Sequence, residues 1–127
     1  MAWVLDSGAM TALARRPQRM AAFVRALRSD GSWPPVVSPA VLVECLTGQG
    51  GRDALVNRLL KTCLIPEHFP EALGRRAAAL RAAARRGSAV DAIVVALAEP
   101  DGTVLTSDPD DLGALAAHAQ DVAVERV

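Results

Sequence analysis

Short runs of β-branched and aliphatic residues alternate along this chain with longer segments rich in alanine, leucine and arginine. The short runs have the length of buried strands, and the longer segments carry apolar residues at helical spacing. Two parallel strands need a crossover connection, which is usually a helix. The alternation therefore predicts an α/β fold in which helices cover both faces of a parallel sheet.

Four strands are expected, and a fifth could lie at an edge of the sheet. They cover residues 3–6, 34–38, 63–66, 103–106 and 122–124. Helices are expected around 20–27 and at 39–46, 52–61, 70–86 and 89–98, with a last one opened by Asp108-Pro109. The predicted fold class is thus α/β, a single-domain three-layer α/β/α sandwich over residues 1–127. Its central, mainly parallel sheet has four to five strands.

The composition sets the type of core and the expected compartment. Hydrophobic residues make up 51% of the 127 residues but aromatic residues only 3%, so alanine, valine and leucine must build the core. No apolar run reaches the roughly 20 residues of a membrane span. The first residues carry no basic segment typical of a signal peptide. Cys45 and Cys63 lie in apolar runs, which favours buried thiols in a reducing cytoplasm.

Charge is unevenly distributed although the net charge is +0. Residues 1–86 hold 13 Lys and Arg against 6 Asp and Glu, and residues 87–127 hold 1 against 8. A uniformly basic nucleic-acid coat is therefore excluded, whereas a basic face beside an acidic pocket is compatible with the sequence. The same charges could also simply cover solvated helices.

Four acidic residues stand out by their surroundings. Asp6 and Asp108 follow predicted strands, whereas Glu44 and Asp91 interrupt otherwise apolar helices. In open parallel sheets the functional crevice lies at the carboxyl ends of the strands. We therefore expect these four acids to meet at one edge of the sheet.

Each acid also has a structural interpretation, and both interpretations stay open. Asp6 and Asp108 could cap the helices that follow them, and Asp91 completes a capping box with Ser88. Glu44 could lie on a narrow polar edge of its helix. Asp110 and Asp111 suit the first turn of the last helix, where negative charge is favourable.

Carboxylates that lie close together need compensation. Two charges about 4 Å apart at an effective dielectric constant of about 20 repel by about 4 kcal/mol. No Lys or Arg is adjacent in sequence to the four acids. A divalent cation held by oxygen ligands, Mg²⁺ or Mn²⁺, is the natural remedy, and it suits phosphoryl chemistry. The two His and two Cys are at unrelated positions, so a zinc site has little support.

The order of the segments at 4–7, 38–44, 90–96 and 105–108 resembles the PIN domain, and the short chain is similar to VapC-type toxins of bacterial toxin–antitoxin pairs. The resemblance implies a metal-dependent endoribonuclease that cleaves RNA. Asp6, Glu44 and Asp91 match the three principal acidic metal-site residues, and Asp108 matches the fourth. Ser7 and Thr106 match polar positions that support the pocket. Gly8 departs from the polar residue that often follows, and the cluster of Asp108, Asp110 and Asp111 leaves open which one faces the metal.

The resemblance also implies partners, namely a second copy of the chain in a homodimer and a cognate antitoxin that covers the acidic cleft. The low aromatic content leaves few rings for base stacking, so arginines would hold RNA through its phosphates. The arginines of the 70–86 helix are candidates, although a solvated helix face explains most of them equally well.

Two other functions compete with the nuclease. A receiver-like phosphoacceptor domain has a similar length and an acidic Mg²⁺ pocket, but it needs a lysine near its last strand. The only lysine here, Lys61, lies between a helix and the third predicted strand. The second alternative is a catalytically silent binding protein that keeps the fold.

Overall fold

The computed structural model describes residues 1–127 and contains seven helices and three short strands. In chain order the elements are β1 (Trp3–Leu5), α1 (Ser7–Ala14), α2 (Pro17–Asp30), α3 (Pro39–Cys45), α4 (Gly50–Leu60), α5 (Glu71–Ala84), α6 (Ala89–Ala98), β2 (Thr103–Thr106), α7 (Pro109–Ala116) and β3 (Ala123–Arg126). None of the helices is long and apolar enough to cross a lipid bilayer.

The sheet has the order β1-β2-β3, and both pairs of strands are parallel. Leu5 lies beside Leu105 in the register of β1 and β2, and Val104 lies beside Val124 in that of β2 and β3. Every residue of β2 is buried, as expected for the central strand. This register brings the carboxyl ends of β1 and β2 together, so the residues that follow them are neighbours.

The expectation of a three-layer sandwich around a four- to five-stranded sheet is wrong. The sheet has three strands, and the chain is mostly helical. The segments predicted as strands at 34–38 and 63–66 form only isolated parallel bridges, Val36 with Val4 and Val36 with Leu64. Prolines within or beside both segments lack the N–H that a strand donates to its neighbour, so the pairing does not extend.

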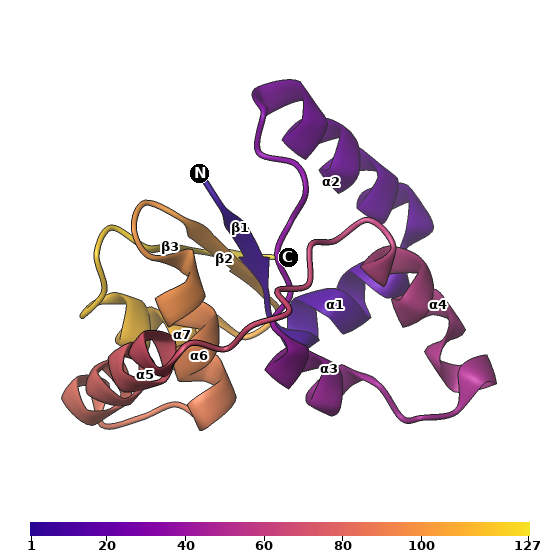
Figure 1. Ribbon diagram of the computed structural model, residues 1–127. Helices are drawn as coiled ribbons and strands as arrows, with labels where there is room; N and C mark the ends of the chain where they lie inside the picture. The colour runs from indigo at the N-terminus through magenta and orange to yellow at the C-terminus, as the bar shows by residue number, and fades with distance from the viewer.

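The helices pack around the small sheet in two groups. Figure 1 shows α5, α6 and α7 gathered on one side and α1, α3 and α4 on the other. The core is one cluster of 21 buried residues, almost all of them alanine, valine or leucine. The composition had predicted this aliphatic core, and the structure confirms it.

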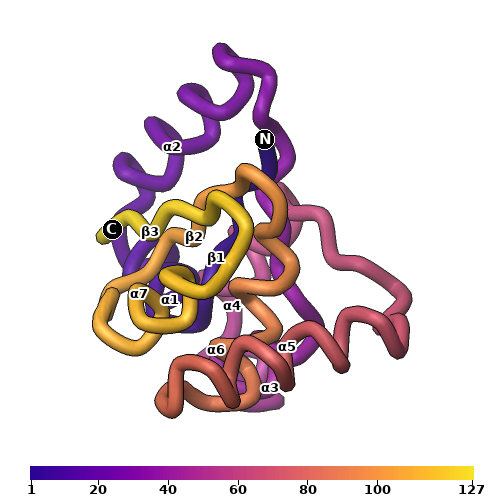
Figure 2. The backbone as a smooth tube through the Cα atoms, turned by 90° about the vertical axis from the view of Figure 1, so that its left-hand side faces the viewer, coloured from indigo at the N-terminus to yellow at the C-terminus, as the bar shows by residue number.

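Helix α2 extends away from the rest of the molecule in both views (Figures 1 and 2). The helix expected around 20–27 is present, but Pro17 opens it and separates it from α1. Leu27 is its one fully buried residue. Phe23 meets Trp3 edge-to-face with a distance of 5.8 Å between ring centroids, which attaches the helix to β1.

Local capping fixes where the helices near the strand ends begin. The Ser38 hydroxyl accepts a hydrogen bond of 3.2 Å from the Ala40 N–H, and Pro39 occupies the first turn of α3. Ser88 and Asp91 form the predicted capping box of α6. These caps set the positions of Glu44 in α3 and of Asp91 in α6.

Candidate acidic site

Asp6 leaves β1 and caps α1. One carboxylate oxygen, Oδ1, accepts a hydrogen bond of 2.7 Å from the Ala9 N–H. The other, Oδ2, accepts a hydrogen bond of 2.5 Å from the hydroxyl of Thr106, at the end of β2. Thr106 is fully buried and Asp6 is half-buried, so this contact between residues 100 positions apart joins the two strand ends.

The surroundings of Asp6 act against its negative charge. Burial is the largest influence and raises the pKa of its carboxyl, whereas the hydrogen bonds from Thr106 and Ala9 lower it. The negative charges of Asp91 and Glu44 raise this pKa further. Asp91 and Glu44, which come from distant parts of the chain, are therefore each close enough to Asp6 to disfavour its charged form.

Asp91 lies in the first turn of α6 and is half-buried. Its Oδ2 accepts a hydrogen bond of 3.0 Å from the Ser88 N–H, and its own N–H donates one of 3.0 Å to the Ser88 hydroxyl. The capping box predicted from the sequence is confirmed. Since Oδ1 takes no part in the box, capping leaves that oxygen available to a ligand.

Glu44 is exposed on α3, and its carboxylate makes no hydrogen bond or ion pair within the chain. It lines an open hollow of about 420 Å³. The other lining residues are Ser7, Gly8, Thr11, Ala12, Arg15 and Ser107. Ser7, predicted as a supporting polar residue, therefore shares this hollow with Glu44.

Asp108 is exposed and caps α7, as its sequence context predicted. Its Oδ1 accepts a long hydrogen bond of 3.4 Å from the Asp110 N–H. Its own N–H donates to the Thr106 hydroxyl at 3.0 Å, so Thr106 links the backbone of Asp108 to the carboxylate of Asp6. Among the neighbouring acids, Asp111 forms an ion pair with Arg86 at 2.8 Å.

Two residues of the hollow were missed in the sequence. A Cβ atom added to Gly8 would lie 2.2 Å from the Ser107 hydroxyl oxygen, so the glycine makes room for this serine at the rim. Arg15, at the end of α1, brings a positive charge to the same hollow as Glu44. The run of arginines at 15–19 was the only available signal, and it did not indicate which arginine faces the site.

The carboxylates of the site lack the arginine partners that three other acidic residues have. The three ion pairs of the molecule are Glu71–Arg75, Glu99–Arg76 and Asp111–Arg86. None of them involves Asp6, Glu44 or Asp91. Three of the five arginines considered for RNA contact in the 70–86 helix are thus paired with carboxylates.

The donor set decides which metal the site could hold. No three or more His, Cys, Asp or Glu side chains are grouped closely enough to bind an ion as they stand. The donors near Asp6 are carboxylate and hydroxyl oxygens, which fit Mg²⁺ or Mn²⁺ held partly through water. Burial raises the pKa of the Cys45 and Cys63 thiols, which disfavours their thiolate forms in the metal-free protein.

No protein-family model matches the chain, and comparisons with curated proteins and with solved structures give no match. The function must therefore be argued from the arrangement of the side chains. That arrangement is an acidic site at the adjoining ends of β1 and β2, with a hydroxyl-rich rim and one arginine.

Proposed function

We propose that this protein is a Mg²⁺- or Mn²⁺-dependent endoribonuclease, the toxin of a type II toxin–antitoxin pair. One observation carries the proposal: the negative charges of Asp91 and Glu44 both raise the pKa of the half-buried Asp6 carboxyl at the end of β1, and no cationic side chain is paired with any of the three. Such a group favours a bound cation. The order of the acids along the chain, similar to that of PIN domains, supports the same function.

The residues take distinct roles in this proposal. Asp6, Glu44 and Asp91 hold the ion directly or through water, and Asp108 completes the acidic set. Thr106 holds the carboxylate of Asp6 in place through its hydroxyl, and Ser7 adds a polar group to the rim. A divalent ion supplies two effects when bound: it lowers the pKa of a coordinated water and stabilises negative charge on a phosphodiester.

The rim of the hollow supports a phosphate-containing substrate. Arg15 and Glu44 line the same hollow, so a phosphodiester entering it would meet a guanidinium as well as a carboxylate. Arginine binds phosphate through paired N–H donors. The proposal includes the partners that the resemblance implies, a second copy of the chain and a cognate antitoxin over the acidic cleft.

Replacing single carboxylates with amides tests the proposed reaction. Asp6→Asn and Asp91→Asn should each reduce RNA cleavage in the presence of Mn²⁺ by at least about 100-fold, because each removes a charge that holds the ion. Cleavage products of purified cellular RNA, followed over time, give the rate. Asp121→Asn is the matched control, since Asp121 is exposed at a positive φ of 54°, which Asn also adopts readily.

Undiminished cleavage by Asp6→Asn or by Asp91→Asn would reject the assignment. Absence of cleavage by the wild-type protein would instead favour a catalytically silent binding protein, which one observation supports: Asp6, Asp91 and Asp108 each cap a helix and so have a structural use. Calorimetric titration with Mn²⁺ separates the two functions, because the silent protein should release or absorb no heat of binding.

A further inference from the structure

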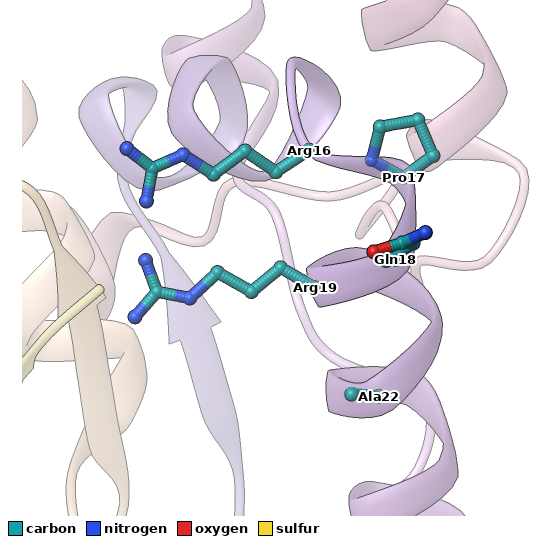
Figure 3. A pocket seen from close by; sticks show the side chains of 5 residues that line it. All are labelled: Arg16, Pro17, Gln18, Arg19 and Ala22. Carbon is teal, nitrogen blue, oxygen red and sulfur yellow. The ribbon is translucent and has the colours of Figure 1, made fainter.

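A second hollow lies where α1 ends and α2 begins. It has a volume of about 540 Å³ and is lined by Arg16, Pro17, Gln18, Arg19 and Ala22. Figure 3 shows the side chains of Arg16 and Arg19 extended next to each other, with both guanidinium groups on the same side of the backbone. Two like charges thus face one open space.

No carboxylate balances these charges. The stretch from residue 7 to residue 29 contains five arginines and no Asp or Glu. Arg15, Arg16 and Arg19 are all exposed, and none of the three ion pairs of the molecule involves them. Exposed guanidinium groups without an ion-pair partner can bind an external anion, such as a phosphate, that accepts several N–H hydrogen bonds at once.

The basic hollow adjoins the acidic site along the chain. Arg15 lines the first hollow with Glu44 and Ser7, and the next residue, Arg16, lines the basic one. Consecutive Cα atoms are about 3.8 Å apart, so the backbone that carries one hollow's arginine continues directly into that of the other. A chain molecule with repeated phosphates could occupy both.

The lining favours a nucleic acid over an acidic peptide. Ala22 is its one small hydrophobic residue, and Pro17 and Gln18 complete the surface between the arginines. Protein partners usually place an apolar or aromatic anchor in a pocket lined by several hydrophobic residues, whereas Ala22 is the one hydrophobic residue here and no aromatic residue lines the hollow. Phosphate contacts need only positive charge and hydrogen-bond donors.

We propose that Arg16 and Arg19 bind backbone phosphates of single-stranded RNA and position the strand whose neighbouring phosphodiester lies in the hollow lined by Glu44 and Arg15. The identity of the strand rests on the proposed function. Binding of RNA by these two arginines would not depend on the base sequence, because phosphates carry no sequence information. Arg16 and Arg19 are thus positioning residues that contact substrate away from the reacting phosphodiester.

Binding of a short fluorescent single-stranded RNA, measured in EDTA over a series of salt concentrations, tests the proposal without cleavage. The double variant Arg16→Gln/Arg19→Gln loses two phosphate contacts. The logarithm of its association constant should therefore fall less steeply with the logarithm of the salt concentration, with a slope smaller in magnitude by about 1.4. At about 0.1 M salt this corresponds to roughly 20-fold weaker binding. The matched control Arg58→Gln/Lys61→Gln removes the same charge from exposed positions of α4 and its end, and it should leave the slope unchanged.

An unchanged slope in the Arg16/Arg19 variant, or equal losses in both double variants, would overturn the proposal. Binding of a glutamate-rich peptide in place of RNA would also overturn it, in favour of a protein partner. The two proposals can fail separately. If Asp6→Asn abolishes cleavage but the Arg16/Arg19 variant binds RNA normally, only this inference fails. If the Arg16/Arg19 variant alone loses RNA binding and no form cleaves RNA, only the nuclease fails.

Discussion

At the scale of single residues, Asp6 and Asp53 are two partly or fully buried aspartates whose surroundings shift their pKa values in opposite directions. The pKa of Asp6 is raised, mainly by burial. The pKa of Asp53 is lowered, first by the hydrogen bond from the Thr47 N–H and further by those from the Thr47 hydroxyl and the Gly48 N–H. The fold thus favours the charged form of Asp53, where a charge stabilises a loop, and disfavours it at Asp6.

The two amide variants should therefore change stability in opposite directions. Asp6→Asn should raise the melting temperature of the metal-free protein at neutral pH by about 3 °C, because it removes a half-buried charge. The new amide can donate to the Thr106 hydroxyl, whose proton can turn to the Asp108 carbonyl oxygen 3.2 Å away. Asp53→Asn should lower the melting temperature by at least about 4 °C, because an amide N–H would face the N–H donors of the loop.

The pH dependence of both effects follows from the two pKa shifts. The raised pKa of Asp6 means that its contribution to stability is complete below its unfolded pKa and is lost as pH rises through the folded one. The advantage of Asp6→Asn should shrink on acidification. The contribution of Asp53 is present above its unfolded pKa and is lost as pH falls through the folded one, so the deficit of Asp53→Asn should also shrink. Melting temperatures of wild type and both variants, measured from neutral to acid pH, give the two stability differences. If both variants change the melting temperature in the same direction at neutral pH, the opposite effects assigned to the two carboxylates are wrong.

At the scale of elements, the turn from α6 into β2 depends on a close approach that only glycine allows. A Cβ atom at Gly102 would lie 2.2 Å from the Ala98 carbonyl oxygen and 3.0 Å from that of Ala2. Both are backbone atoms and cannot rotate away. The Ala2 oxygen also accepts the Thr103 N–H at 2.8 Å, a bond beside the start of the β1–β2 pair.

We expect Gly102→Ala to destabilise the fold by at least about 2 kcal/mol in urea unfolding, because β2 must move to relieve the clash. Gly113→Ala is the matched control. Gly113 lies within α7 and has no atom within 4 Å of an added Cβ, so the change should stabilise the protein by about 0.5–1 kcal/mol. Similar small effects of both substitutions would show that the turn adapts to a side chain.

The elements that the sequence predicted well are those with local signals. Ser38-Pro39, the Ser88 and Asp91 box, and Asp108-Pro109 mark helix starts through contacts within a few residues, and all three are found where expected. The extent of a strand depends on partners far along the chain. The β-branched residues at 36–37 and 65 favour strands, yet these segments pair through single bridges because prolines flank them.

The site was predictable to a similar degree. Asp6 and Asp91 could be singled out because an acid within an apolar run is conspicuous in one dimension. Arg15 and Ser107 could not, because their place at the rim arises from the meeting of α1 with the end of β2. An arginine next to others at the end of a helix is indistinguishable by sequence from a solvated one.

At the scale of the whole molecule, the acidic site joins two parts of opposite charge. Residues 1–86, with 13 basic and 6 acidic side chains, supply Asp6 and Glu44, and residues 87–127, with 1 and 8, supply Asp91 and Asp108. A cation held between Asp6 and Asp91 would connect β1 to α6, which belong to different parts. Such an ion binds the folded chain in preference to the unfolded one, and it should stabilise the entire fold.

Mn²⁺ at about 100 times its dissociation constant should therefore stabilise the wild-type protein by about 2.7 kcal/mol, measured as a rise in melting temperature over the EDTA-treated form. Asp6→Asn and Asp91→Asn should lose most of this rise although Asp6→Asn is more stable without metal, because stabilisation by the ion requires the charges that destabilise the metal-free site. Asp121→Asn should keep the full response. Asp108→Ala distinguishes the two roles of its carboxylate: a loss of about 1 kcal/mol with an unchanged Mn²⁺ response would assign Asp108 to capping alone. Equal responses to Mn²⁺ in Asp6→Asn and wild type would exclude Asp6 as a ligand.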